Sequence, residues 1–355
     1  MRTNPKKYQF FITYRDSILA SAASKPVIDT RNTLTSLGYE DCSLSFKRHT
    51  KSLSYYLSVL FKFSRFLFKI KKGSLVATQY PLPTVGYFFI YIIKLAALRG
   101  IYFISIIHDI DTLRTKESDK AQMKKELKML SAYNGLVVHN DVMKSWLFEN
   151  GLEKTTKAVS LNCFDYLSSN KVFDEKPNSN SLNEIAFAGH LAKSGFIYEL
   201  TYIKNWKFNI YGTGFEKERN RTPYVIWQGE FSPDEIVYHL KGSFGLVWDG
   251  ADSSNIETNT FGNYMRYNNP FKFSLYLAAG LPVIAPATAA IAKTIQEKNI
   301  GFLINDLEDL NNVNVSESSY QVMKENVKVL QKDIVVGNYL RKAVQRLEQS
   351  IQADT

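Results

Sequence analysis

Short apolar runs recur along the first half of the chain, separated by segments of helix length. These runs are 9–13, 41–46, 74–80, 102–109, 135–140 and 157–162. Most positions within a run are apolar, with little alternation, which is typical of strands covered on both faces. Such strands, joined by helices, form a parallel sheet. We therefore predict a Rossmann-like domain over residues 1–168.

A second series of runs begins after a polar stretch. The stretch 165–183 is rich in Ser, Asn and charged residues and cannot bury much apolar area, so we predict a linker at 169–182. The later runs are 185–189, 207–212, 225–229, 245–249, 282–286 and 301–305. They predict a second Rossmann-like domain over 183–335.

The last segment, 336–355, is predicted to be a helix with one apolar stripe. Leu340, Val344, Leu347 and Ile351 recur every three or four residues. The helix is a candidate to cross back to the first domain. The fold class is thus α/β, with two doubly wound domains facing each other across a cleft.

Composition narrows the class of protein. The 355 residues are 45% hydrophobic and include two cysteines, too few for a disulfide framework or a Cys-rich zinc site. The start of the chain has no signal-peptide pattern, and the most apolar stretch, 85–98, is interrupted by Lys94 and is shorter than the ~20 residues that span a bilayer. We expect a cytoplasmic protein without a transmembrane helix.

Charge is unevenly distributed along the chain. Residues 1–170 contain 25 Lys and Arg against 13 Asp and Glu, whereas 171–355 contain 19 against 21. The first half therefore favours an anionic partner: nucleic acid, a membrane surface or a phosphorylated substrate. No recognised DNA- or RNA-binding motif is present, so a nucleic-acid partner is disfavoured.

The segment 267–284 carries the strongest chemical signal. A helix that starts at Pro270 and ends with Ala278-Ala279-Gly280 leads into a buried strand. A helix N-terminus presents unpaired N–H groups, and Lys272 adds a full positive charge one turn in. This pattern favours a diphosphate site over an ordinary helix with a solvated lysine.

The same segment, PFKFSLYLAAGLPVIA, resembles the donor-binding segment of GT-B glycosyltransferases. Four further segments, 11–14, 107–114, 187–194 and 245–250, resemble bacterial β-1,6-galactofuranosyltransferases and the related streptococcal adhesin glucosyltransferases. The resemblance covers nearly the whole chain. It implies a UDP-sugar donor held mainly by the second domain, a glycan acceptor held mainly by the first, and no cofactor or metal.

The resemblance also implies site residues. Lys272 and Lys193 would contact the diphosphate, with Asn268, Asn269, Gly189, Tyr211 and the strand-end Gly212 nearby. Many retaining GT-B enzymes have a Glu three residues after this lysine, where the present chain has Leu275. This difference favours an inverting reaction.

An inverting transfer needs a general base, and His108-Asp109-Ile110-Asp111 follows a predicted strand of the first domain. We favour Asp109 as the base, with His108 and Asp16 as alternatives. A purely structural interpretation is open, in which Asp109 caps the next helix and His108 packs. Asp109 and Asp111 also form a DxD pattern, which is short enough to arise by chance. The five histidines show no metal-ligand spacing.

The predicted helix 53–72 has a basic stripe beside a wide apolar face. Lys62, Arg65, Lys69 and Lys72 continue a line begun by Ser54 and Ser58. The helix therefore lies on a membrane, with these four residues facing the membrane or the acceptor, or else is a buried crossover helix with a solvated edge.

These patterns predict an inverting enzyme that transfers a hexose from a UDP donor to a glycan of a cell-surface polysaccharide. Galactofuranose is the favoured hexose. One alternative is a UDP-glucose-dependent glucosyltransferase acting on a protein- or lipid-linked glycan. A basic nucleic-acid-binding protein is the alternative from another class. The acceptor and the oligomeric state, a homo-oligomer included, stay open.

Overall fold

The computed structural model describes residues 6–14, 24–46, 52–82, 89–115, 120–168, 181–250 and 260–353. The chain divides into two compact units. Unit 1 comprises 1–19, 27–161 and 340–355, and unit 2 comprises 20–26 and 162–339. The division falls a few residues before the linker predicted at 169–182, most of which lies outside the described residues. Among the helices that are described, none is long and apolar enough to cross a bilayer.

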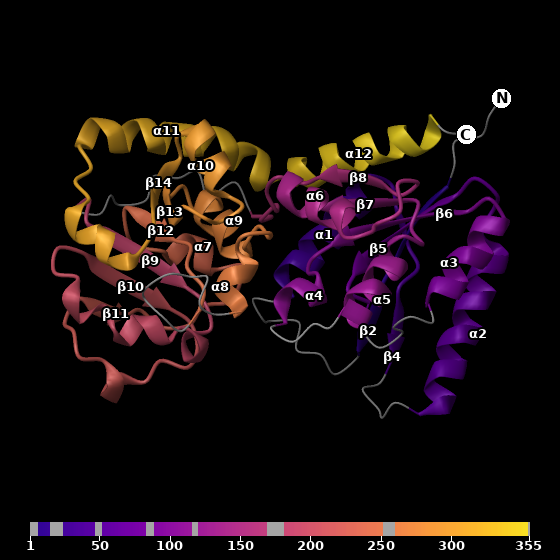
Figure 1. The fold of residues 1–355 in the computed structure, drawn as a ribbon, viewed down its shortest axis with the longest axis horizontal. Helices are drawn as coiled ribbons and strands as arrows, with labels where there is room; N and C mark the ends of the chain where they lie inside the picture. The colour runs from indigo at the N-terminus through magenta and orange to yellow at the C-terminus, as the bar shows by residue number, and fades with distance from the viewer. Residues whose placement is uncertain are drawn as a thin grey trace. The chain divides into compact units, whose positions relative to one another are not determined.

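Unit 1 is built on a parallel six-stranded sheet with the order β3-β1-β5-β6-β7-β8. Its strands are β1 (Lys7–Phe10), β3 (Glu40–Asp41), β5 (Leu75–Tyr80), β6 (Tyr102–Ile107), β7 (Gly135–Val138) and β8 (Lys157–Ser160). Its helices are α1 (Lys25–Ser36), α2 (Leu53–Lys69), α3 (Phe89–Leu98), α4 (Asp111–Arg114), α5 (Lys120–Leu130) and α6 (Asp141–Glu149) (Figure 1). The alternation of strands and helices follows the predicted pattern.

Two predicted strands of unit 1 are each divided in the structure. The run 9–13 overlaps the end of β1 and the start of β2 (Ile12–Tyr14), and the run 41–46 covers the end of β3 and all of β4 (Leu44–Phe46). β2 pairs with β4 in a separate two-stranded sheet. The apolar pattern predicts extended backbone, but which neighbour a strand pairs with depends on the packed unit.

The C-terminal helix α12 (Asn338–Gln352) packs within unit 1. Its buried stripe is Leu340, Ala343, Val344, Leu347 and Ile351. Leu347 fills the space beside β7 so closely that a Cβ on Gly135 would lie 2.6 Å from its Cδ1 atom. Glu348 accepts hydrogen bonds from Lys7 Nζ and Tyr39 Oη, both at 2.7 Å. Glu348 thus bonds to residues more than 300 positions earlier in the chain, and the last helix is part of the first domain.

Unit 2 has a second parallel six-stranded sheet, with the order β11-β10-β9-β12-β13-β14. Its strands are β9 (Glu184–Ala188), β10 (Lys207–Tyr211), β11 (Val225–Trp227), β12 (Phe244–Leu246), β13 (Val283–Pro286) and β14 (Gly301–Ile304). Its helices are α7 (Ile236–His239), α8 (Thr260–Tyr264), α9 (Phe271–Ala278), α10 (Ala292–Lys298) and α11 (Glu317–Ile334). The strand order reverses between β9 and β12, which is where ligands bind in open α/β sheets.

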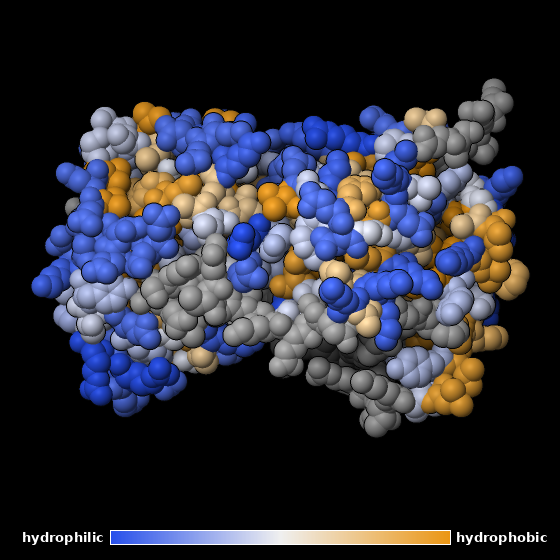
Figure 2. Space-filling view, viewed as in Figure 1, coloured by the Kyte–Doolittle hydropathy of each residue, from blue (hydrophilic) through white to orange (hydrophobic). Residues whose placement is uncertain are grey.

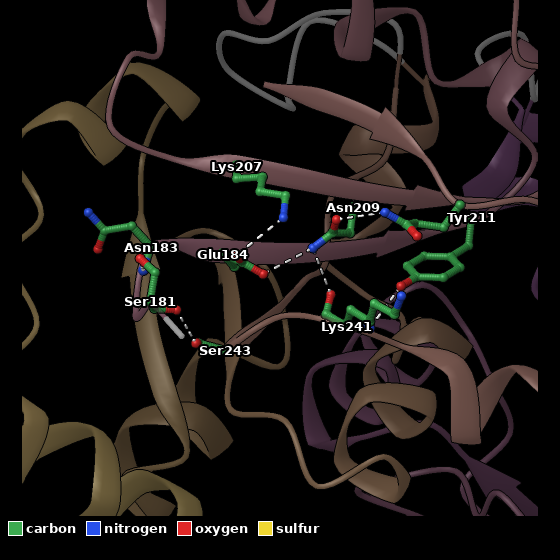
Figure 3. Close-up of polar contacts among 9 residues, drawn as sticks. Ser181, Asn183, Glu184, Lys207, Asn209, Tyr211, Lys241 and Ser243 are labelled. Carbon is green, nitrogen blue, oxygen red and sulfur yellow. Dashed lines mark hydrogen bonds and ion pairs between the residues drawn. The ribbon is translucent and has the colours of Figure 1, made fainter. Parts of the chain in front are cut away.

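A polar network ties the opposite, amino-terminal end of this sheet together (Figure 3). Glu184 at the start of β9 accepts from Lys207 Nζ at 3.3 Å and from Asn209 Nδ2 at 3.4 Å. The same Asn209 amide donates to the Lys241 carbonyl at 3.2 Å. Because Asn209 is almost fully buried, these bonds satisfy groups that would otherwise be costly to bury. The network joins β9, β10 and the segment before β12, and its role is structural.

Candidate functional site

The reversal point of the second sheet contains a largely buried cation. Lys272, in the first turn of α9, places its Nζ atom 2.8 Å from the Trp248 carbonyl oxygen and 3.2 Å from Asp249 Oδ1. The ammonium group also lies 4.8 Å from the ring centroid of Phe187, on β9. Only 15% of the lysine side chain is exposed. α9 thus fixes one positive charge between the ends of β9 and β12.

The position of α9 depends on Tyr276. The Ala188 backbone N–H donates to Tyr276 Oη at 2.9 Å, which joins α9 to the end of β9. The phenol ring covers Gly245 on β12, where a Cβ would lie 2.1 Å from Tyr276 Cγ. Tyr276 is not among the site residues predicted from the sequence. Gly245 is a signal for such a contact, because a glycine inside a strand often marks a place where another group approaches the backbone closely. Trp248 and Asp249 were likewise unassigned, within a motif that was recognised.

Glycines shape the backbone beside this cation. The Gly189 N–H donates to the Tyr211 carbonyl and the Gly212 N–H to the Gly229 carbonyl, both at 3.0 Å. Gly212 has φ +128°, and a Cβ there would lie 1.9 Å from the Gly189 carbonyl oxygen. A Cβ on Gly189 would lie 3.9 Å from Lys272 Nζ. The predicted Lys272, Gly189 and Gly212 therefore come together, and the arrangement suits an anionic group such as a phosphate.

The other predicted donor residues are used differently. Lys193 ends the short 3-10 helix η3 (Leu191–Lys193) and is exposed. Asn268 Oδ1 is buried and accepts no hydrogen bond from the described residues. Asn269 Nδ2 donates to the Asn162 carbonyl at 2.9 Å. Tyr211 Oη accepts from the Lys241 N–H at 2.8 Å and donates to the His239 carbonyl at 3.1 Å. The side chains of Asn269 and Tyr211 thus hold the domain together.

In unit 1, His108 and Asp109 follow β6. Asp109 Oδ2 accepts from Arg114 Nη1 at 2.8 Å, and 31% of the Asp109 side chain is exposed. His108 Nε2 lies 2.5 Å from Gln79 Oε1. Since the Gln79 amide donates to the Val27 carbonyl, its Oε1 atom faces the imidazole as an acceptor, and Nε2 carries the proton. Burial lowers the pKa of His108 to about 4, so its ring is neutral at pH 7.

His139 lies at the end of the neighbouring strand β7 and interacts with His108. Burial, with the nearby His108 charge, lowers the pKa of His139 to about 3. Two imidazoles and one carboxylate therefore gather at the carboxyl ends of β6 and β7. Asp109 is the carboxylate of this set and is partly exposed, whereas both rings resist protonation because burial disfavours their charged form.

The helix after Asp109 is capped by another residue. Glu126 on α5 accepts from the Asp111 N–H at 2.9 Å and the Thr112 N–H at 2.8 Å, and also from the Thr112 hydroxyl. Tyr80 Oη donates to the same carboxylate at 2.8 Å. A capping role for Asp109 is therefore not what the structure shows. Burial, with the Glu126 charge, raises the pKa of Asp111.

Three remaining sequence predictions concern other parts of unit 1. Asp16 lies outside the described residues. Lys62, Arg65 and Lys69 on α2, and Lys72 just after it, are exposed. Across the described ranges, no three His, Cys, Asp or Glu side chains cluster as metal ligands would.

Comparison with known proteins assigns a family to this pair of domains. Residues 9–163 match the sequence model described as "Glucosyltransferase 3-like, N-terminal domain", and residues 185–347 match the corresponding C-terminal domain. The chain belongs to the glucosyltransferase 3-like family. The two matches cover most of both parallel sheets and include Lys272 of unit 2 as well as His108, Asp109 and His139 of unit 1.

Two curated relatives have similar identity. The β-1,6-galactofuranosyltransferase WbbI of Escherichia coli (strain K12) is 29% identical over 250 residues, 69% of this chain and 70% of the relative. Glucosyltransferase 3 of Streptococcus gordonii is 28% identical over 245 residues, 67% of this chain and 68% of the relative. The chain is therefore a glycosyltransferase, as its resemblance predicted.

Solved structures confirm the fold. WaaG, a glycosyltransferase involved in lipopolysaccharide biosynthesis, superposes with a TM-score of 0.58 at 12% identity, covering 96% of this chain and 99% of WaaG. An α-glucosyltransferase (AGT) in complex with UDP gives a TM-score of 0.54 at 10% identity, covering 97% and 99%. The fold is the GT-B fold, which confirms the predicted α/β class with two Rossmann-like domains.

Proposed function

We propose that this glycosyltransferase transfers a hexose from a UDP-sugar to a hydroxyl group of a glycan, with inversion at the anomeric carbon. The observation that carries the proposal is the largely buried Lys272 ammonium at the reversal point of the second sheet. Its partners are one carbonyl and one carboxylate beside glycine-lined strand ends, so it can also meet a diphosphate. A fixed cation there would stabilise the charge that develops on departing UDP.

The reaction then needs one proton acceptor. As the acceptor oxygen bonds to the anomeric carbon, the bond from that carbon to the UDP oxygen breaks, and the hydroxyl proton passes to Asp109. Asp109 suits this role because its carboxylate is partly exposed and held by Arg114. Neutral His108 and His139 beside it would orient the acceptor hydroxyl rather than take its proton.

Inversion is favoured by the residue three positions after the lysine. Leu275 is apolar and buried on α9, so this position offers no carboxylate to the nucleotide sugar. The metal-free reaction predicted from the resemblance is part of the same proposal, with Lys272 and the α9 N-terminus providing the charge stabilisation.

Galactofuranose is our first choice of sugar, because a relative with 29% identity is named a β-1,6-galactofuranosyltransferase. Glucose is the second choice, because a relative with nearly equal identity is named Glucosyltransferase 3. A UDP donor is supported by the AGT structure of the same fold, which was solved with UDP. We propose a glycan of a cell-surface polysaccharide as the acceptor.

A donor panel tests the proposal. UDP-galactofuranose, UDP-galactose and UDP-glucose would each be offered with candidate glycans, and released UDP would be measured. We expect one donor to be used much faster than the others, and NMR of the product to show the opposite anomeric configuration. A product with retained configuration would refute the inverting mechanism. Use of GDP- or ADP-sugars in preference to all three would refute the UDP donor.

A further inference from the structure

Two neighbouring helices of unit 1 present an apolar surface to solvent. Helix α2 buries Val59, Phe63 and Leu67, and α3 lies beside it, with the Phe63 and Phe89 ring centroids 5.1 Å apart. Near the carboxyl ends of both helices, the Arg99 guanidinium group lies over the Phe68 ring, 5.4 Å from its centroid. Figure 2 shows hydrophobic side chains gathered over these helices, at the right edge of the view. Packing against the sheet thus uses only part of the apolar surface of α2.

The exposed side chains are large. Leu53, Leu57, Phe61 and Phe68 on α2 are 56–77% exposed, and Tyr91, Leu95 and Leu98 on α3 are 55–86% exposed. These seven are nearly half of the fifteen large exposed hydrophobic residues found in the part of the chain that the structure describes. Such a concentration marks an interaction surface, because scattered exposed apolar residues are ordinary but a patch is not. We call these seven residues the α2–α3 patch.

A basic stripe borders the patch. Along α2, the exposed Lys62, Arg65 and Lys69 recur every three or four residues beside the stripe of Leu57, Phe61 and Phe68. The 50 residues from 51 to 100 contain eight Lys and Arg and no Asp or Glu. Whatever covers the patch must therefore accept apolar side chains and positive charge together.

The positive charge beside the α2–α3 patch distinguishes among three candidate partners: a second copy of the chain, a polyanion in water and an anionic bilayer. In a symmetric dimer the same surface meets itself, so the basic stripes of two copies would approach each other with no acidic residue from this region between them. A polyanion in water would bind the lysines but leave the aromatic side chains exposed. An anionic bilayer meets both requirements, because phenyl and leucyl groups enter the interface while lysine stems reach the headgroups. We propose that the α2–α3 patch docks this glycosyltransferase on anionic lipid bilayers.

Sedimentation of the full chain with vesicles tests the charge requirement. We expect uptake onto phosphatidylglycerol–phosphatidylcholine vesicles and little onto phosphatidylcholine alone. Replacing Lys62, Arg65, Lys69 and Lys72 with Gln should weaken partitioning roughly 10²- to 10³-fold, since each basic residue near the surface contributes about fivefold. The matched control, Lys154, Lys204, Lys298 and Lys332 to Gln, removes the same charge elsewhere and should keep most of the binding.

A second pair of variants tests the apolar requirement. Leu57→Gln with Phe61→Gln should weaken binding about tenfold or more, whereas Val322→Gln with Val329→Gln, equally exposed on α11, should have little effect. In a Phe61→Trp variant, lipids brominated on the acyl chains should quench the new tryptophan. Melting temperature and its response to UDP should be unchanged in all four multiple variants, which separates docking from the proposed donor site.

Three results would overturn the proposal. One is equal sedimentation of the basic variant and its control. Another is a tryptophan at position 61 that acyl-chain bromine does not quench while the protein is bound. The third is a wild-type dimer that ignores anionic vesicles and becomes monomeric when Leu57 and Phe61 are replaced, since a second copy would then be the occupant.

Discussion

The two domains have the same parallel six-stranded plan but end their strands with different chemistry. In unit 2 the strand ends near the reversal point carry Gly189, Gly212 and the largely buried ammonium group of Lys272. In unit 1 the ends of β6 and β7 carry His108, Asp109 and His139. Glycine backbone with one fixed charge suits binding of an anion, whereas titratable side chains suit movement of a proton.

The difference extends to the outer surfaces. The first half of the chain has an excess of 12 positive charges, from 25 Lys and Arg against 13 Asp and Glu. The second half has an excess of two negative charges, from 19 against 21. Two domains of one fold can therefore serve different roles, because function depends on the residues at strand ends and surfaces.

The largest effect is expected at the cation. Lys272→Ala should lower kcat/KM roughly 10³-fold and remove most of the rise in melting temperature caused by UDP, because a charge-stabilising donor is lost. Lys293→Ala, an exposed lysine on α10 of the same unit, is the control and should change neither. Differential scanning fluorimetry with and without UDP gives the second readout. Equal UDP responses of wild type and Lys272→Ala would remove the donor role from unit 2.

A slightly smaller effect is expected in unit 1. Asp109→Asn should lower kcat roughly 10²-fold or more while UDP still raises the melting temperature, because a general base contributes about 10² to 10⁴. Asp111→Asn is the matched control, since Asp111 belongs to the same turn and contacts the capping Glu126 through its N–H. If the Asp109 variant turns over normally, the division of roles between the domains fails at this residue.

Backbone substitutions compare two glycines with positive φ in unit 2. Gly212→Ala should destabilise the protein by roughly 3 kcal/mol, because its Cβ would meet the Gly189 carbonyl at 1.9 Å. Gly229 has φ +103° but no atom within 4 Å of a Cβ, so Gly229→Ala should cost only about 1 kcal/mol. Urea unfolding measures both. Equal losses would show that the strand ends are less tightly packed than the structure indicates.

Unit 1 should be the more acid-sensitive domain. Burial lowers the pKa of His108 to about 4 and of His139 to about 3, from an ordinary value of 6.5. The unfolded chain therefore binds more protons below pH 6.5 than the folded chain, and stability falls as pH decreases from there towards 4. Between pH 7 and pH 5 the loss should be about 2 kcal/mol for one such histidine. His139→Gln should make the pH dependence of urea unfolding shallower; an unchanged slope would contradict this assignment.

The smallest effect is expected from chelation. Turnover should persist in EDTA at the rate seen without it, because the proposed charge stabilisation comes from Lys272 and the α9 N-terminus. UDP release measured after dialysis against EDTA, with and without added Mn²⁺, checks this. Strict dependence on Mn²⁺ would return the Asp109–Asp111 pair to consideration as a metal site.

Sequence patterns predicted much of this molecule. Every apolar run proposed as a strand overlaps one, and the helix proposed from Pro270 is α9. The sequence also predicts that Lys272, Gly189 and Gly212 lie near one another, as they do, because a parallel sheet brings the ends of its strands to one edge. Local periodicity and strand-end chemistry are properties of short segments, which a sequence records directly.

Other features depended on packing between distant segments. The sequence grouped Tyr211 and Asn269 with the donor residues, but the folded chain uses their side chains to bind Lys241 and Asn162. Tyr276 went unnoticed because its role arises from contact with Gly245 and Ala188 on two strands. The cap from Glu126 to α4 likewise joins separate helices. Hydrogen-bond partners are chosen by three-dimensional proximity, which no linear spacing encodes.

The sequence alone thus determined the two-domain α/β plan, the charge asymmetry and the positive charge of Lys272 in the first turn of the helix after Pro270. Only the tertiary structure decided that α12 completes the first domain, that Glu126 rather than Asp109 caps α4, and that the apolar face of α2 continues onto α3 in solvent. The physical reason is that burial is a collective property. A Phe at position 63 and a Phe at position 61 are alike in sequence, but the first packs on Phe10 and Phe89 while the second remains 70% exposed.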